Sequence, residues 1–133
     1  MRLTSAIASR VVETIIERVG ERGAAVAVVD DHGELLAFRR SDACPFTSIT
    51  IAQNKAYTAA RERRPSKAVG QASADEGFPM SNFGDPRMVT WGGGIPILVG
   101  VTVVGAVGVS GLPEQVDIEL AGEGVRLAQA LLT

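Results

Sequence analysis

The sequence predicts an α/β fold, in the wider sense that includes α+β, with its elements in the order α-β-β-α-β-β-β-α. Three observations predict it. Apolar residues recur at helical spacing near the N-terminus, β-branched runs alternate with turn residues, and a final helical segment follows Pro113. A length of 133 residues with 46% hydrophobic content suits one domain, residues 1–133, around a single core.

The first helix is predicted by an apolar stripe that follows two residues able to cap a helix, Thr4 and Ser5. The stripe repeats at helical spacing along one face, and its members are Ile7, Val11, Ile15 and Val19. Because glycine commonly ends a helix, this one is expected to end at Gly20 or Gly23.

A hairpin is expected next, because two short apolar runs flank a cluster of turn-forming residues. The runs are residues 24–29 and 35–38, and the cluster, DDHG, is residues 30–33. Strands joined by so short a turn pair in the antiparallel sense.

The second helix, residues 48–64, is predicted by a narrow stripe of mostly small residues. Its members are Ile49, Ala52, Ala56, Ala59 and Ala60. Thr50 and Gln53 have the spacing of a capping box, and Pro65 ends the helix. Since alanine lets a helix lie close to a sheet, we expect this helix across one face of the sheet.

A long irregular connection is expected over residues 65–86, in which residues 66–70 could hold one turn of helix. Loops of this length in a compact domain are often functional. Three short strands then follow at residues 87–91, 96–99 and 103–109. They bring the predicted sheet to five strands.

The last helix is expected from Pro113 to Leu131, with proline at or near its first position. Glu114 and Asp117 lie in its first turn, where carboxylates interact favourably with the helix dipole. They are either surface partners of that dipole or, if they face the preceding glycines, proton acceptors.

Two parts of the sequence carry a resemblance to a known family. One is KAYTAA at residues 55–60, and the other is GGG-x-P-I followed by VGAVGVSG within residues 92–111. In this order and spacing they resemble the GlcG/HbpS family, which includes the C-terminal domain of PduO-type proteins. The resemblance implies a profilin-like α/β/α fold, with a five-stranded antiparallel sheet and helices on both faces. It also implies a homo-oligomer, a dimer or larger.

Charge and composition narrow the partners and the location. A net charge of −2 and a pI near 5.4 provide no field to hold a polyanion, so no nucleic-acid partner is expected. The longest apolar stretch, residues 95–109, is shorter than the roughly 20 residues of a membrane-spanning helix, so no membrane partner is expected. With one cysteine, Cys44, and no signal-peptide pattern, a cytoplasmic location is expected.

Lys55 and the consecutive glycines Gly92, Gly93 and Gly94 are the main candidates for a ligand site. The glycines form either a plain tight bend or a row of backbone N–H groups suited to a small organic anion. Lys55 lies among alanines, where it either extends to solvent or points a cation into a cleft. The family's motif carries a lysine at this place, and the resemblance implies that Lys55 contacts the ligand.

Two further residues are candidate ligand contacts. Ser110 precedes the last helix, where it either caps the first turn or joins the free N–H groups of that turn in holding an anion. Arg40 ends the second predicted strand. The candidate catalytic residues are Lys55, Glu114 and Asp117, since a lysine amine and nearby carboxylates can exchange protons with a bound anion.

Haem is also a cofactor to consider, because the resemblance covers haem-binding and haem-sensing proteins. Iron needs an axial donor such as His, Cys, Met or Tyr. The one histidine, His32, lies in the DDHG turn, where a solvated side chain is expected, and the other donors are Cys44, Tyr57, Met80 and Met88. These residues alone do not support haem binding, and the lack of Cys or His pairs predicts no metal site.

Three functions stay open from the sequence. The first is an enzyme of small organic acid or carbonyl catabolism that acts by proton transfer, in isomerisation, hydration or hydrolysis. Lys55 would then bind or exchange protons, the glycines would stabilise an oxyanion, and Glu114 or Asp117 would assist. The second is a non-catalytic carrier or sensor of haem or another tetrapyrrole, and the third is a structural subunit of an oligomer.

Overall fold

A four-stranded antiparallel sheet forms the middle layer of the molecule. The computed structural model describes residues 2–133. The strand order is β2-β1-β4-β3, and the bounds are β1 Ala25–Asp30, β2 Leu35–Arg40, β3 Gly94–Val99 and β4 Thr102–Ser110. The predicted hairpin over residues 24–38 is confirmed, and β3 and β4 also pair in the antiparallel sense.

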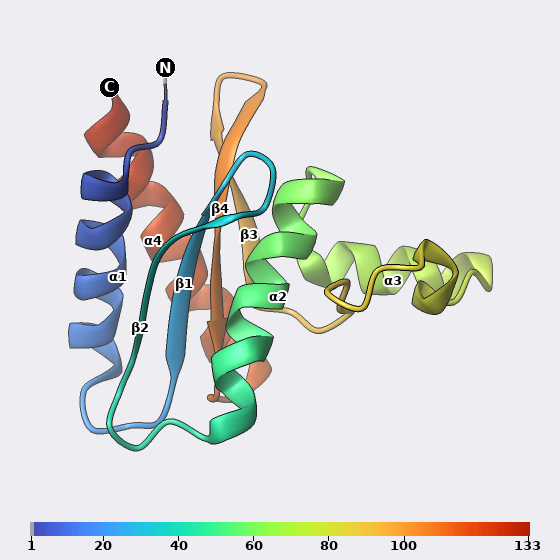
Figure 1. Cartoon of the computed structure of the whole chain (residues 1–133), viewed down its shortest axis with the longest axis horizontal. Coiled ribbons are helices and arrows are strands. Elements are labelled where there is room, and N and C mark those ends of the chain that lie inside the picture. The colour runs from blue at the N-terminus through green and yellow to red at the C-terminus, as the bar shows by residue number, and fades with distance from the viewer. Residues whose placement is uncertain (1) are drawn as a thin grey trace.

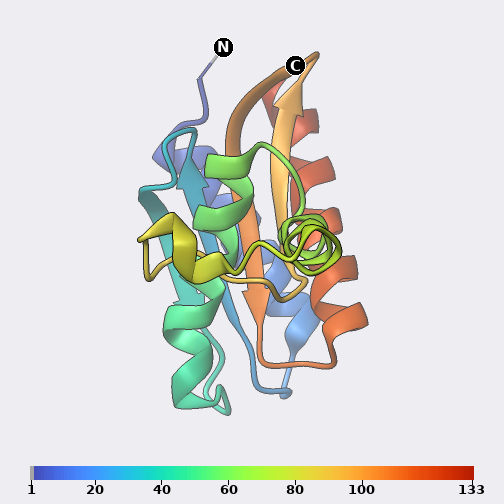
Figure 2. The same ribbon diagram turned by 90° about the vertical axis from the view of Figure 1, so that its right-hand side faces the viewer.

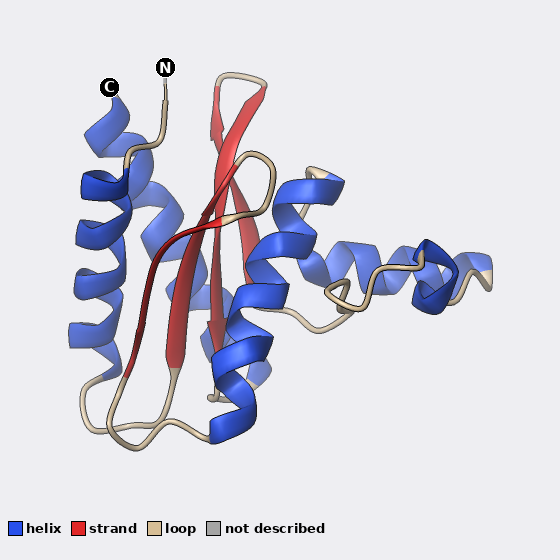
Figure 3. Cartoon of the chain, viewed as in Figure 1, coloured by secondary structure: helices blue, strands red, loops and turns tan. Residues whose placement is uncertain are grey.

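Helices cover both faces of the sheet, as expected. Helices α1 (Ser5–Val19) and α4 (Glu114–Leu132) pack side by side on one face, and α2 (Phe46–Glu62) crosses the other (Figures 1 and 3). Helix α3 (Ser66–Glu76) and the short 3-10 helix η1 (Met80–Phe83) extend away from the sheet beyond α2, as the two views show (Figures 1 and 2). No helix within residues 2–133 is long and apolar enough to cross a membrane.

The expectation of a fifth strand at residues 87–91 is wrong, and the sheet has four strands. This segment is bound to α2 rather than to a strand edge, because the N–H of Val89 donates to Oγ1 of Thr58 at 2.9 Å. Both sides of the central strand β4 are already paired, with β1 and β3. A short β-branched run indicates extended backbone, but the sequence does not tell which partner accepts its hydrogen bonds.

The expectation for residues 65–86 is wrong in part, since most of the segment is helical. Pro65 precedes the first turn of α3, and Gly77, with a φ of 63°, ends it. Small and polar residues with Gly70 in the middle gave no apolar stripe to predict a full helix. Helix α2 also begins at Phe46, two residues earlier than expected, and Gln53 donates to the Ile49 carbonyl instead of closing a capping box.

Two apolar layers hold the sheet between its helices. The layer under α1 and α4 is built of branched side chains such as Val11, Ile15 and Val107. The layer under α2 is mostly alanine. This lets α2 approach β4 so closely that a Cβ added at Gly108 would lie 2.1 Å from the carbonyl oxygen of Ala52. The close approach places Lys55 of α2 at the end of β4.

Candidate functional site

A pocket of about 370 Å³, named here the Lys55 pocket, opens where β4 ends and α4 begins. It is lined by most of the residues selected from the sequence as site candidates: Lys55, Gly92, Ser110, Glu114 and Asp117. Apolar side chains from three different segments complete its walls: Ile51, Trp91 and Leu112. The fold thus brings together Lys55 and Asp117, which are 62 positions apart in the chain.

Lys55 and Asp117 form a buried ion pair at the floor of this pocket. The two side chains are 4% and 3% exposed, and Nζ of Lys55 lies 3.2 Å from Oδ2 of Asp117. The ammonium also donates to the carbonyl oxygen of Val109 at 2.9 Å. Burial lowers the pKa of Lys55, against the opposing effects of Asp117 and Glu114, and burial raises the pKa of Asp117, against those of Lys55. Asp117 thus supplies the counter-charge of Lys55 inside the protein.

Asp117 also holds the turn that leads into α4. Its Oδ1 accepts the N–H of Leu112 at 3.2 Å, while Oδ2 faces Lys55. A single carboxylate thus connects the β4–α4 turn to the middle of α2. Asp117 therefore constrains the structure more strongly than a carboxylate that only interacts with the helix dipole at the surface, which was the alternative left by the sequence.

Glu114 bridges two donors at the mouth of the pocket. Its Oε1 lies 2.6 Å from Nζ of Lys67, and its Oε2 accepts the N–H of Gly92 at 2.8 Å. The hydrogen bond from Lys67, followed by that from Gly92, lowers the pKa of Glu114, so the carboxylate is charged near neutral pH. Lys67 lies on α3, within the segment expected to be irregular, and the sequence offered no spacing that could have selected it.

The three glycines form a bend whose N–H groups are partly used within the protein. Gly92 donates to Glu114, and Gly94 donates to Oγ of Ser66 at 2.9 Å. Gly93 has a φ of 126°, and a Cβ there would lie 2.5 Å from the Val109 carbonyl oxygen and 3.0 Å from Nζ of Lys55. Glycine is required at Gly93 both for its backbone conformation and for the close approach of Lys55 and β4.

Arg40 does not join the other site candidates. It ends the edge strand β2, is exposed, and is not among the lining residues of the Lys55 pocket. The register pairs Ala25 with both Arg40 and Ser110, so Arg40 lies two strands from the pocket at the same end of the sheet.

A second pocket, also of about 370 Å³, lies at the opposite end of β4 and contains His32; it is named here the His32 pocket. Its apolar walls are Leu3, Leu36, Val103 and Val104, and its charged lining residues are Arg2, Asp30 and Asp31. The carboxylate of Asp30 fixes the turn, because Oδ1 accepts the N–H groups of His32 at 2.9 Å and Glu34 at 3.0 Å. The turn histidine is exposed, as expected, yet it also lines a pocket of ligand size.

Three of the other possible iron donors are less available than His32. Cys44 is buried, and burial raises the pKa of its thiol. The Tyr57 hydroxyl is hydrogen-bonded to Asp85, and its ring is covered by the guanidinium groups of Arg61 and Arg87. Met80 lines a space of only about 40 Å³ on the projecting arm. Within residues 2–133, no group of three or more His, Cys, Asp or Glu side chains could hold a metal ion.

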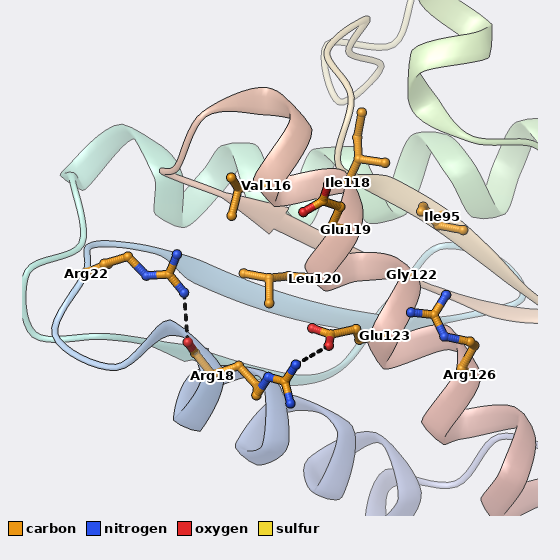
Figure 4. A pocket seen from close by; sticks show the side chains of 10 residues that line it. All are labelled: Arg18, Arg22, Ile95, Val116, Ile118, Glu119, Leu120, Gly122, Glu123 and Arg126. Carbon is orange, nitrogen blue, oxygen red and sulfur yellow. Dashed lines mark hydrogen bonds and ion pairs between the residues drawn. The ribbon is translucent and has the colours of Figure 1, made fainter.

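A third and wider pocket, of about 580 Å³, lies between the end of α1 and the side of α4 (Figure 4). Arg18, Arg22 and Arg126 surround it, and Arg18 is paired with Glu123 at 2.5 Å. Its lining contains no histidine, cysteine, methionine or tyrosine, so it offers no axial donor to iron.

Comparison with known proteins relates nearly the whole chain to one family. The model of the family described as "Haem degrading protein HbpS-like" matches residues 3–126. Protein GlcG of Escherichia coli K12 is 39% identical over 85 residues, which are 64% of this chain and 62% of GlcG. The chain thus matches less than two thirds of the length of that relative.

Solved structures share the fold. A double mutant of HbpS from Streptomyces reticuli is 26% identical, with a TM-score of 0.83 over 100% of this chain and 88% of HbpS. A complex of PduOC with haem superposes with a TM-score of 0.87 at 20% identity and covers 96% of this chain and 95% of PduOC. At that identity, the PduOC structure speaks for the fold alone.

Proposed function

We propose that this chain, which belongs to the HbpS-like family of haem-degrading proteins, is a haem-binding domain. The family description supports this function over catabolism of a small organic acid. The observation that carries the proposal is the position of His32, the one histidine of the chain, on the wall of a pocket of about 370 Å³.

Beside the carboxylates of Asp30 and Asp31, the lining of the His32 pocket offers groups that haem uses. The imidazole would supply the axial nitrogen, and the guanidinium of Arg2 would pair with a propionate. Leu3, Leu36 and Val103 would cover apolar surface of the macrocycle. When bound, haem supplies an iron centre whose ligand-binding and redox properties depend on the axial donor and on the polarity of the pocket.

The chain prepares this site through the β1–β2 turn. The backbone N–H groups of His32 and Glu34 donate to Asp30, and these hydrogen bonds hold the backbone of the turn. The fixed backbone limits the directions in which the imidazole can point. Strand β4 supplies the opposite wall with Val103 and Val104.

Titration of the full chain with haemin, followed by the Soret band, tests this function. We expect saturable binding, and His32→Ala should weaken it at least tenfold and change the Soret maximum, because the axial donor is lost. Met80→Leu, which changes another possible donor on the arm, should leave both quantities unchanged. An unaltered spectrum and affinity in His32→Ala would contradict the assignment of His32, and the absence of saturable binding would contradict the function.

A second candidate function is the binding of a small organic anion in the Lys55 pocket. The convergence of Lys55, the N–H of Gly92 and the hydroxyl of Ser110 on one pocket favours it. This pocket does not suit haem, since its lining has no histidine, cysteine, methionine or tyrosine. Saturable binding of acetate to the full chain, without haem, would test it.

We also propose that the chain forms a homo-oligomer, as the resemblance implies. Phe46 and Trp91 are 84% and 56% exposed, and both lie at or next to the Lys55 pocket, where a second copy would cover them. Sedimentation velocity should then give a dimer or a larger species, and a monomer at all concentrations would contradict this proposal.

A further inference from the structure

The charge available to a ligand in the Lys55 pocket does not come from Lys55. Its ammonium is paired with Asp117, and both side chains are almost completely buried. A buried pair whose charges match each other presents little net charge to a third group. A second cation, Lys67, contacts Glu114, which lines the same pocket, and the side chain of Lys67 is 55% exposed.

Lys67 and the N–H of Gly92 converge on one carboxylate. Glu114 accepts from Lys67 with one oxygen at 2.6 Å and from Gly92 with the other at 2.8 Å. An ammonium and a backbone N–H that address the two oxygens of one carboxylate form a subsite for such a group. In this structure the carboxylate comes from the protein itself.

Glu114 is able to leave this position. Its side chain is 41% exposed, and an ion pair between exposed side chains contributes little to stability. Asp117, by contrast, is fixed by Lys55 and by the N–H of Leu112. Of the two carboxylates in the first turn of α4, Glu114 is therefore the exchangeable one.

We propose that Gly92 N–H and Lys67 form a carboxylate-binding subsite of the Lys55 pocket, and that Glu114 occupies it as an internal competitor when no ligand is bound. The ligand class is a small carboxylic acid, whose carboxylate replaces that of Glu114 and whose remaining part lies against Ile51, Trp91 and Leu112. This inference rests on the second candidate function, anion binding in the Lys55 pocket, and is independent of haem.

The competitor role has an unusual consequence, which is that removal of a pocket carboxylate improves anion binding. In Glu114→Ala, Gly92 and Lys67 lose their internal partner, so a ligand carboxylate no longer has to displace it. Addition of Lys67→Ala removes the cation and should cancel the gain. Glu119→Ala is the matched control, because Glu119 is an exposed carboxylate of α4 that does not line the Lys55 pocket.

The experiment is a titration of the ¹⁵N-labelled full chain with sodium acetate, at ionic strength kept constant with sodium chloride, followed at the Gly92 amide signal. We expect a dissociation constant about two- to fivefold lower in Glu114→Ala than in the unmodified chain, since the contact that the ligand no longer has to displace is a weak one, and no such gain in Glu119→Ala or Glu114→Ala/Lys67→Ala. The same spectra report whether each variant is folded, and Glu114→Gln serves as a second variant if Glu114→Ala is not.

The outcomes separate the two proposals. Equal, saturable acetate binding in Glu114→Ala and the unmodified chain would overturn the competitor role and leave anion binding in place. The absence of a saturable shift in every variant would overturn both.

Discussion

At the scale of single residues, the main result is that Lys55 has a matched charge rather than a free one. The sequence left two alternatives for it, extension to solvent or a cation in a cleft. The structure agrees with neither in full, because Lys55 lines the pocket but its ammonium is bonded to Asp117 and Val109. Lys55 is therefore not an unpaired cation that is free to bind an anion.

Loss of one member of this pair should destabilise the protein strongly. In Asp117→Asn, the Lys55 ammonium stays buried without a counter-charge, and we expect the free energy of unfolding in urea to fall by about 3–5 kcal/mol. The double variant Lys55→Met/Asp117→Leu buries no charge and should recover most of this loss. A change below about 1 kcal/mol in Asp117→Asn would contradict the buried pair as a structural constraint.

Part of the site could be predicted from residues alone. Lys55, Gly92, Ser110, Glu114 and Asp117 were selected from the sequence and meet at one pocket. Lys67 and Ser66, which bond to Glu114 and Gly94, could not be selected, because their importance comes only from the folded position of α3. The glycine N–H groups were assigned to a ligand from the sequence, whereas two of them donate hydrogen bonds to side chains of the protein.

At the scale of secondary structure elements, the close contact of α2 with β4 determines where the Lys55 pocket forms. The alanine stripe predicted that α2 lies close to one face of the sheet, and Gly108 on β4 allows the close contact by leaving no side chain between strand and helix. The strand at residues 87–91 was predicted wrongly for a related reason. Its β-branched pattern is local, whereas its hydrogen-bond partner, Thr58, lies on α2.

The substitution Gly108→Ala tests this contact. An added Cβ would lie 2.1 Å from the Ala52 carbonyl oxygen, so α2 must move away from the sheet. We expect a loss of at least about 1–3 kcal/mol in the free energy of unfolding, measured in urea.

Gly122→Ala on α4 is the matched control. The nearest atom to its added Cβ, a guanidinium nitrogen of Arg126, is 3.4 Å away. Alanine is also preferred to glycine within a helix, so this variant should be as stable as the original chain or more stable. Equal stability of both variants would show that α2 does not lie as close to β4 as described.

At the scale of the whole molecule, the two ligand-sized pockets at opposite ends of β4 differ in chemistry. Both pockets have apolar walls and carboxylates, but the His32 pocket has an imidazole, whereas the cation of the Lys55 pocket is paired with Asp117. The order of elements could be predicted well enough to place these ends, and β1 pairs along its full length with residues 105–110 of β4. The pocket around His32 could not be predicted, because it forms only when Leu3 and Val104, which are about a hundred residues apart, line the same space.

The location of bound haem is the most direct test of the proposed function. Ferric haem is paramagnetic and broadens the amide signals of nearby residues in ¹⁵N spectra. With haemin bound, we expect the signals of His32, Val103 and Val104 to be lost, and those of Gly92, Ser110 and Leu112 to remain. Loss of the second group with retention of the first would place haem at the Lys55 pocket and contradict the His32 site.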